Sequence, residues 1–440
     1  MSSLRSRFDG EFGLPGSEIY SEGRRIWYPP ARKREPLAVI RPAGTDDVVN
    51  VVKWARREGL RLSPRSGGHS FDGFPVQPGT ILLDLSQLSY SHLSADGILQ
   101  VQPGAQALSL ANALSPQGRA LPTGDCGSVA LGGLLAGGGF GYASRQMGLT
   151  IDSVIEAIVV TGEGNVVRAS DRENQDLFWA CRGGGGTAGI VTEFMVRSFP
   201  VDQVTAFSMT WAWDSVRDAI LAFDEAITTA PRSFDLKLKI RTTGKERFLD
   251  FASSGPPGCV PGTPIVEMSG QYLGDRAEAE AFLDPLLDHA GVSNAEVNEE
   301  SYFNAMLDLM PLPTLDDTAP ETLRPVRVAS DYMDMAMDRL FAEEIVGYID
   351  CLQNSPDFWG GCLLIEPCDG AVGDVPVGST AYPHRNNRLL LQWELIHPIN
   401  QSDVEIALLD QFLTNTRQKL APRLKNDRYL NYAGARLYCT

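Results

Sequence analysis

Two glycine-rich stretches each place a nucleophilic side chain beside a flexible loop. The first reads Arg65-Ser66-Gly67-Gly68-His69-Ser70, and the second spans residues 121–141, with Cys126 near its start and a run of glycines near its end. Glycines let backbone approach a ligand closely and adopt positive φ, and successive N–H groups can form a nest for a pyrophosphate. The imidazole and the thiol could each attach to whatever the loops hold. The alternative is that these are glycine loops without a ligand.

The glycine spacing argues against the two commonest nucleotide-binding motifs. No Gly-x-x-x-x-Gly-Lys-Ser/Thr sequence occurs, which argues against a P-loop. Residues 137–141 read Gly-Gly-Gly-Phe-Gly rather than Gly-x-Gly-x-x-Gly, and no acid follows at the spacing that binds a ribose in a Rossmann fold.

Three further motifs accompany the two loops in a fixed order. Residues 174–186 lead into 189–194, residues 381–385 precede a strand ending at Gln392-Trp393, and Tyr429-Leu430-Asn431-Tyr432 lies near the C-terminus. Together the motifs resemble FAD-linked oxidases of the vanillyl-alcohol-oxidase superfamily, in the berberine-bridge-enzyme-like branch. The resemblance covers nearly the whole chain and is specific for the family, though not for a substrate.

The resemblance implies an α+β fold and a covalently held cofactor. A two-part FAD-binding domain of the vanillyl-alcohol-oxidase type would be joined to a substrate domain, in which helices cover one face of an antiparallel sheet. FAD would be tethered twice, by His69 to its 8α-methyl group and by Cys126 to ring position 6. The expected cofactor contacts are Arg65, Ser66, Gly67, Gly68, His69, Ser70, Gly124, Cys126, Gly127, Ser128, Val129, Gly132, Gly133, Gly137, Gly139, Gly189, Ile190, Val191 and Asn431.

Val129 bears on whether oxygen accepts the electrons of the reduced flavin. It matches the position where a small residue lets oxygen approach the ring and a bulkier one hinders it, which favours an oxidase using O2 over a dehydrogenase. The alternative is that Val129 only packs.

The catalytic base is less well determined. Such oxidases pass a hydride to the flavin and a proton to a base. Tyr429 matches the first tyrosine of the family's Tyr-x-Asn-Tyr motif, which often serves as base, and the Tyr432 hydroxyl could serve equally. Gln392 occupies a position where some relatives carry a glutamate base, but an amide cannot take up a proton. Other candidates are Tyr142, Tyr382 and Glu366. A tyrosine, with an ordinary pKa of about 10, would need a nearby cation or hydrogen-bond donor, and these tyrosines could instead be core residues.

Hydrophobic patterning divides the chain near Pro200. Before it, short strands (37–40, 81–85, 98–101) alternate with helices (48–58, 105–114). After it, the pattern predicts strands at 204–213, 234–240, 248–253 and 266–272, and helices at 215–229, 276–290 and 404–420. We therefore expect an N-terminal FAD-binding part at 1–200, a substrate domain at 201–414, and a return to the FAD-binding domain at 415–440.

Composition limits the partners and the setting. A formal net charge of −17 argues against nucleic acid and anionic membranes as partners. No run of 18 apolar residues occurs, and the first ten residues lack the apolar core of a signal peptide. The seven cysteines are scattered, without a disulfide framework or metal-ligand spacing. A cytoplasmic protein is expected, and the excess of arginine over lysine suggests a bacterial source.

The expected function is oxidation of a small molecule, with FAD and O2. A secondary metabolite or a sugar is the expected substrate, and natural-product tailoring is the favoured setting. Two alternatives stay open. One is a redox-neutral cyclisation or isomerisation on a flavoprotein scaffold. The other is a flavoprotein without turnover, which the short stretch after the Tyr-x-Asn-Tyr motif suggests, because relatives usually continue further. The oligomeric state is also open.

Overall fold

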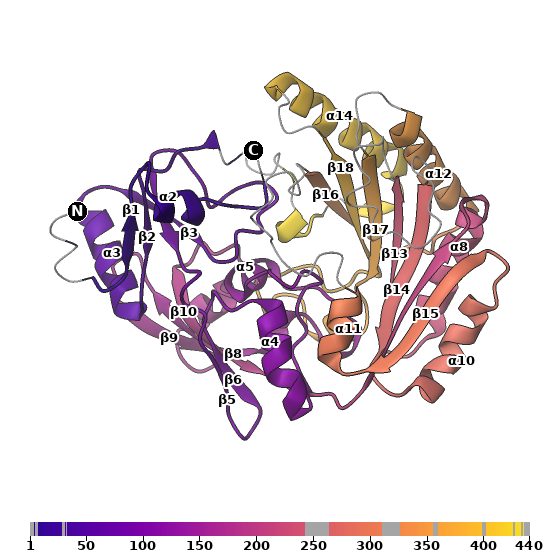
Figure 1. Cartoon of the computed structure of the whole chain (residues 1–440), viewed down its shortest axis with the longest axis horizontal. Helices are drawn as coiled ribbons and strands as arrows, with labels where there is room; N and C mark the ends of the chain where they lie inside the picture. The colour runs from indigo at the N-terminus through magenta and orange to yellow at the C-terminus, as the bar shows by residue number, and fades with distance from the viewer. Residues whose placement is uncertain are drawn as a thin grey trace.

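The computed structural model describes residues 4, 8–28, 31, 33–242, 264–309, 326–354, 360–397, 402–425, 427–432 and 434. The strand predicted at 248–253 lies outside these residues. Figure 1 shows two lobes side by side, the first built from the N-terminal half of the chain and the second from the rest.

The first lobe contains two sheets. One sheet has the strand order β1-β2-β4-β3, and β2 and β3 both run parallel to β4. Helix α3 packs on this sheet. The bounds are β1 Glu11–Gly13, β2 Ala38–Arg41, β3 Arg61–Arg65, β4 Thr80–Asp84 and α3 Thr45–Arg57. The other is antiparallel, in the order β5-β6-β10-β8-β9; its strands are β5 Ser91–Leu93, β6 Ile98–Val101, β8 Val154–Val160, β9 Val166–Ser170 and β10 Ile190–Arg197.

Short elements surround these sheets and carry the predicted loops. They are α2 Glu18–Gly23, α4 Ala107–Leu114, β7 Arg119–Ala120, α5 Leu131–Gly137, α6 Ser144–Met147, α7 Gln175–Ala180 and β11 Phe199–Pro200, with 3₁₀ turns at Ser115–Gln117 and Thr150–Ser153. The first glycine loop follows β3, and the second leads into α5.

The second lobe is an eight-stranded antiparallel sheet in the order β15-β12-β14-β13-β17-β18-β16-β19. Its strands are β12 Val204–Trp211, β13 Phe234–Thr242, β14 Pro264–Tyr272, β15 Val292–Glu300, β16 Val326–Met333, β17 Gly360–Pro367, β18 Leu389–Ile396 and β19 Leu424–Lys425. The helices are α8 Val216–Thr229, α10 Arg276–Leu287, α11 Tyr302–Leu309, α12 Arg339–Asn354, α13 Ala371–Asp374 and α14 Asp403–Leu420, with 3₁₀ turns at Trp213–Ser215 and Leu430–Tyr432.

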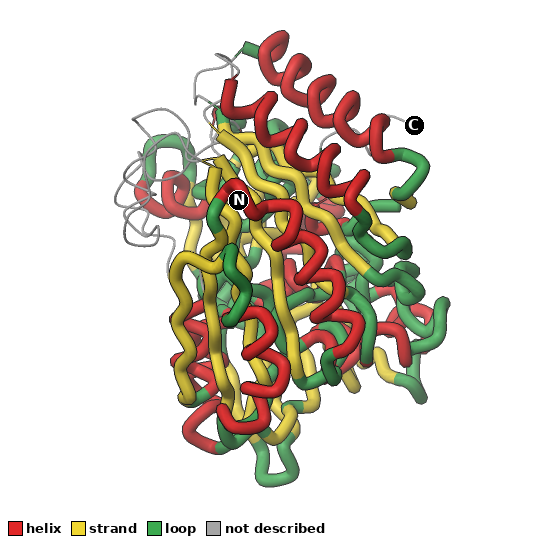
Figure 2. The backbone as a smooth tube through the Cα atoms, turned by 90° about the vertical axis from the view of Figure 1, so that its right-hand side faces the viewer, coloured by secondary structure: helices red, strands yellow, loops and turns green. Residues whose placement is uncertain are grey.

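Figure 2 shows long helices lying across one face of this sheet. The apolar residues of α8, α10, α12 and α14 share one core with the alternate residues Leu236, Leu238 and Ile240 of β13. Because side chains alternate between the two faces of a strand, Asp235, Lys237 and Lys239 face the opposite side. The expectation of an antiparallel sheet with helices on one face is confirmed.

Buried arginines join the two lobes. Arg385 donates to both carboxylate oxygens of Asp152, at 2.7 and 2.8 Å. Arg145 of α6 lies 2.8 Å from Asp369 and also donates to the Ile227 carbonyl at the end of α8. Within the described part of the chain, no helix is both long and apolar enough to cross a bilayer.

The chain departs from the predicted boundaries near its end. The boundary expected after residue 414 falls inside α14, and Leu420 at the end of that helix still packs in the core of the second lobe. We therefore propose that the return to the first lobe begins after α14. The strand predicted to end at Trp393 continues to Ile396.

Candidate flavin and substrate site

The two glycine loops are in direct contact. A Cβ on Gly67 would lie 2.7 Å from the Ala130 backbone nitrogen, and one on Gly132 would lie 2.5 Å from Ser66 Oγ. The absence of a side chain at these positions lets the first loop pack against the start of α5. The sequence placed His69 and Cys126 far apart, and this contact brings their loops together.

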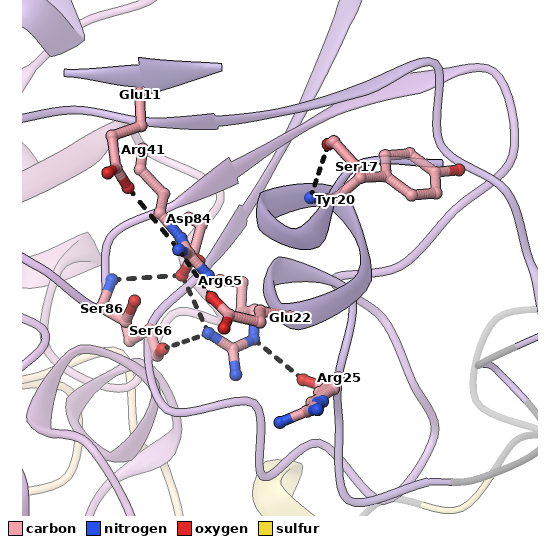
Figure 3. A network of polar contacts seen from close by, with 10 residues as sticks. All are labelled: Glu11, Ser17, Tyr20, Glu22, Arg25, Arg41, Arg65, Ser66, Asp84 and Ser86. Carbon is pink, nitrogen blue, oxygen red and sulfur yellow. Dashed lines mark hydrogen bonds and ion pairs between the residues drawn. The ribbon is translucent and has the colours of Figure 1, made fainter. Parts of the chain in front are cut away.

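A buried carboxylate fixes the first loop (Figure 3). Asp84, at the end of β4, is fully buried; its Oδ1 lies 2.8 Å from Arg65 Nη1 and its Oδ2 lies 2.8 Å from Arg41 Nε. Arg65 also donates through Nε to the Arg25 carbonyl at 3.1 Å. The Arg65 side chain therefore holds the loop in place, and its expected contact with FAD stays a prediction.

His69 has the chemistry of a neutral nucleophile. Its ring stacks on Trp27 at 5.2 Å, and its Nε2 lies 2.9 Å from Ser128 Oγ, in the second loop. Burial, with the charge of Arg65 adding to it, lowers the pKa of His69 to about 4. The imidazole is therefore uncharged at neutral pH, and a ring nitrogen keeps the lone pair that bond formation requires.

Cys126 lies in a tight turn of the second loop. The Val129 N–H donates to the Cys126 carbonyl at 3.1 Å, and the thiol is half-buried. Burial, followed by the charges of Asp125 and Glu394, raises the pKa of Cys126 to about 12. The resting side chain is therefore a protonated thiol, and Lys239 and Lys237 act in the opposite direction.

The space beside the glycines at 137–141 is occupied largely by other protein atoms. A Cβ on Gly137 would lie 2.2 Å from Asn431 Oδ1, and one on Gly139, where φ is +90°, would lie 2.0 Å from Thr150 Oγ1. These glycines admit neighbouring side chains. Gly133 differs, because no atom beyond its own neighbours lies within 4 Å of a Cβ placed there.

The two tyrosines of the C-terminal motif lie in different surroundings. Tyr429 is 1% exposed, and its hydroxyl accepts the Gly139 N–H at 2.8 Å and the Asn431 amide at 2.9 Å. Burial raises its pKa to about 12 although both donors lower it. Tyr429 and Asn431 thus fasten the end of the chain to the glycine run.

Tyr432 instead lies between the loops and the second lobe. Its ring is half-buried and meets Phe71, just beyond His69, edge-on at 6.0 Å. Burial raises its pKa well above the ordinary value, and the charges of Glu366, Asp125 and Cys126 contribute. Tyr432 is therefore the tyrosine of the motif that contacts the segment following the first glycine loop.

The face of the large sheet opposite α8, α10, α12 and α14 presents charged residues to the second glycine loop. Lys237 is 1% exposed, forms ion pairs with Asp125 and Glu366, and lies 4.3 Å above the Tyr142 ring. Sequence reasoning missed Lys237; the signal was the alternation Asp-Leu-Lys-Leu-Lys-Ile-Arg at 235–241, in which every second residue is polar. A strand with that pattern and buried on both faces must direct its polar residues toward a polar partner.

Glu394 is a second residue that the sequence did not reveal. It lies two positions beyond Gln392 on the same face of β18 and accepts a hydrogen bond from the Gln392 amide. Burial raises the pKa of Glu394 to about 7. Glu366 is oriented by Lys237 through one oxygen, while its buried Oε2 has no hydrogen-bond partner in the described part of the chain.

The other predicted residues are placed as follows. Tyr382 is buried, with its hydroxyl 2.8 Å from that of Tyr332, and Tyr142 bonds Ser269 at 2.9 Å. Five further positions make local backbone contacts. The Ser70 hydroxyl accepts a hydrogen bond from the Phe74 N–H, and the Gly127 carbonyl accepts one from the Leu108 N–H. Gly189, Ile190 and Val191 lie where β10 meets β8. Val129 packs against the first-lobe core. The cofactor contacts expected of these residues, and of Gly68 and Gly124, stay predictions.

Comparison with known proteins gives a consistent result. Residues 36–170 match the FAD binding domain family. Carbohydrate oxidase of Microdochium nivale is 29% identical over 418 residues, covering 91% of this chain and 80% of the relative. Berberine bridge enzyme-like 12 of Arabidopsis thaliana is 27% identical, covering 90% and 75% respectively. Among solved structures, carbohydrate oxidase from Microdochium nivale in complex with a substrate analogue has a TM-score of 0.81 at 25% identity, covering 99% of this chain and 91% of the other.

The chain is an FAD-dependent oxidase that is similar to carbohydrate oxidases and to berberine-bridge-enzyme-like proteins. Its fold agrees with that of berberine bridge enzyme itself, a variant of which superposes with a TM-score of 0.83 at 21% identity, covering 98% of this chain and 87% of the other. The expected resemblance to these oxidases, the fold class, the FAD cofactor, the oxidase chemistry and a small-molecule substrate are confirmed. The residues of this oxidase that hold FAD and carry the reaction remain to be proposed.

Proposed function

We propose that this oxidase removes two electrons from a hydroxyl-bearing, sugar-like molecule, with FAD attached through His69 and Cys126. The observation that carries the proposal is the polar face of the large sheet lying against the second glycine loop, where Lys237 forms an ion pair with Asp125 beside Cys126. Hydrogen-bonding and charged groups on a rigid sheet suit a hydroxyl-rich substrate. Relatives named carbohydrate oxidase and glucooligosaccharide oxidase support the same substrate class.

The residues present fit a flavin. Gly133 leaves open space at the start of α5, and His69 supplies a neutral imidazole within a hydrogen bond of the second loop. Ser128 engages Nε2, which leaves Nδ1 for attachment. The chemistry supplied by bound FAD is acceptance of a hydride and delivery of the electrons to oxygen.

We assign proton acceptance to Tyr432, with Glu366 behind it. Because its pKa is raised, Tyr432 enters the reaction protonated and must pass on its own proton as it receives that of the substrate hydroxyl. Glu366 has an oxygen without a hydrogen-bond partner and is the leading charge acting on Tyr432. Tyr429, whose hydroxyl already accepts two hydrogen bonds, holds the loop instead.

Anaerobic mixing with candidate substrates tests the function. Glucose, cellobiose and longer oligosaccharides should bleach the yellow flavin, and admission of air should restore the colour with formation of hydrogen peroxide. Product without bleaching would favour the redox-neutral alternative. If sugars fail and aromatic natural products bleach the flavin, the enzyme tailors secondary metabolites.

A further inference from the structure

The outer end of the polar face carries a cation that the enzyme's own carboxylates leave unpaired. Lys237 is neutralised by Asp125 and Glu366, and Arg241 Nη2 lies 3.2 Å from a Glu267 oxygen. Lys239 lies between these two residues on β13. Among the described residues it forms no ion pair and no hydrogen bond through its side chain.

Such a side chain is costly to leave unpaired. Lys239 is only partly exposed. Burial lowers its pKa, but Tyr142, Glu267 and Asp125 together outweigh burial and raise the pKa above the ordinary value. It therefore remains an ammonium, and a partly buried charge favours a counter-ion. Arg241 adds a second donor, because its buried Nε–H has no hydrogen-bond partner among the residues that the structure describes.

This donor pair lies beside the predicted reaction centre. Lys237, the neighbouring residue on the same face of β13, forms an ion pair with Asp125, which adjoins Cys126 in the sequence. The register pairs Lys239 with Leu364 of β17, and Leu364 with Gln392 of β18, so Lys239 and Gln392 share the central strip of the face. A group bound at Lys239 therefore belongs to a molecule in the substrate site.

We propose that Lys239, assisted by the Arg241 Nε–H, binds a carboxylate of the substrate, so that this oxidase prefers acidic sugars to neutral ones. The inference rests on the proposed sugar-like substrate. A monoanion suits the site better than a dianion, because Glu267 stands opposite Lys239 in the β13–β14 register and would repel a second negative charge, as would Glu394.

Steady-state kinetics with D-glucuronate and D-glucose test the proposal, since the two sugars differ mainly in the carboxylate. Wild-type enzyme should show at least about tenfold higher kcat/KM for glucuronate, the usual worth of a charged hydrogen bond. Lys239→Met should lose about 10–100-fold on glucuronate, mainly through KM, and less than about threefold on glucose. Lys239→Arg should keep most of the preference, and Lys53→Met, on the exposed face of α3, serves as the control.

Other outcomes overturn the proposal. Equal losses of kcat/KM on both sugars, or no preference of the wild type for glucuronate, would mean that Lys239 does not bind a substrate carboxylate. A fall in covalently retained flavin in Lys239→Met would mean that it acts on Cys126 instead. Glucose 6-phosphate outperforming glucuronate would replace the carboxylate with a phosphate.

A binding measurement separates this inference from the proposed function. If neither sugar reduces the flavin, the sugar-oxidase proposal fails. Glucuronate is then titrated while the flavin absorbance is followed: saturable binding weakened at least about tenfold in Lys239→Met keeps the carboxylate site, and no saturable change rejects it.

Discussion

At the scale of residues, we assign proton acceptance to Tyr432 and anchoring of the glycine run to Tyr429, two roles that the sequence motif alone does not distinguish. Tyr432→Phe should slow anaerobic flavin reduction by about 10²–10⁴-fold, the usual worth of a positioned acid–base group, with normal flavin content. Tyr429→Phe removes the acceptor of the Gly139 N–H and should lower thermal stability, while its flavin reduction should slow far less than that of Tyr432→Phe. Stopped-flow reduction measures both. The reverse order of effects would return the base to Tyr429.

Covalent attachment is tested by the flavin that survives denaturation. The wild-type protein should stay yellow after acid precipitation, and His69→Ala and Cys126→Ala should each keep flavin through the other residue. We expect His69→Ala to be the weaker of the two in covalent yield, because the Cys126 thiol is protonated at neutral pH while His69 is already a free base. The double variant should release all flavin. Flavin washing out of denatured wild type would contradict the tether.

Glu394 gives a pH-dependent contribution to stability. Its pKa is raised from 4.5 to about 7 in the folded protein, so the unfolded chain loses this proton first and stability falls as pH rises between these values. Glu394→Gln should therefore gain in thermal midpoint, relative to wild type, from pH 5 to pH 8. Glu343→Gln is the control, because Arg217 lowers the pKa of Glu343 and its contribution is already complete by pH 5. A difference for Glu394→Gln that does not change with pH would reject the raised pKa.

At the scale of elements, substitution of Gly133 by alanine distinguishes a contact with the cofactor from the general effect of alanine on helix stability. An alanine at Gly133 in α5 and one at Gly347 in α12 both meet no atoms within 4 Å and both sit in helices. Each should stabilise the apoprotein by roughly 0.5–1 kcal/mol. If FAD approaches the start of α5, only Gly133→Ala should lower flavin content, measured by the ratio of flavin absorbance to protein absorbance. Equal flavin content in both variants would remove Gly133 from the cofactor site.

The elements also show what the sequence could and could not predict. Alternation and capping placed β2, α3, β4, β12 and α8 within a few residues, because each buries one face against a partner that the pattern implies. The charged residues of β13 and β18 were not assigned to the site, because a polar residue in a strand has the same signature whether it faces water or a buried counter-charge. The glycine run at 137–141 was interpreted as a cofactor cradle, whereas Gly137 and Gly139 admit Asn431 and Thr150. Asn431 lies far from Gly137 in the sequence, so spacing alone cannot reveal that it occupies this position.

At the scale of the whole molecule, the Arg385–Asp152 pair fixes the two lobes relative to each other. Arg385 is 1% exposed, so Arg385→Met would leave a largely buried carboxylate unpaired, at a cost of about 3–5 kcal/mol. The thermal midpoint should fall by several degrees, and adding Asp152→Asn should recover part of the loss. Arg217→Met, which breaks the exposed pair with Glu343, should change the midpoint little. A midpoint for Arg385→Met equal to that of Arg217→Met would contradict the structural role.

The hydrogen bond from Gly139 to Tyr429 has a consequence for how the protein is made. It joins residues 290 positions apart, and Asn431 fills the space left by Gly137 in the same contact. During synthesis the glycine run must therefore wait, incompletely packed, while the whole second lobe is translated. The part of the enzyme that we propose to hold FAD is among the last to be finished, although its loops are among the first to be translated. Stable loading of the flavin is then expected to follow completion of the chain rather than to accompany it.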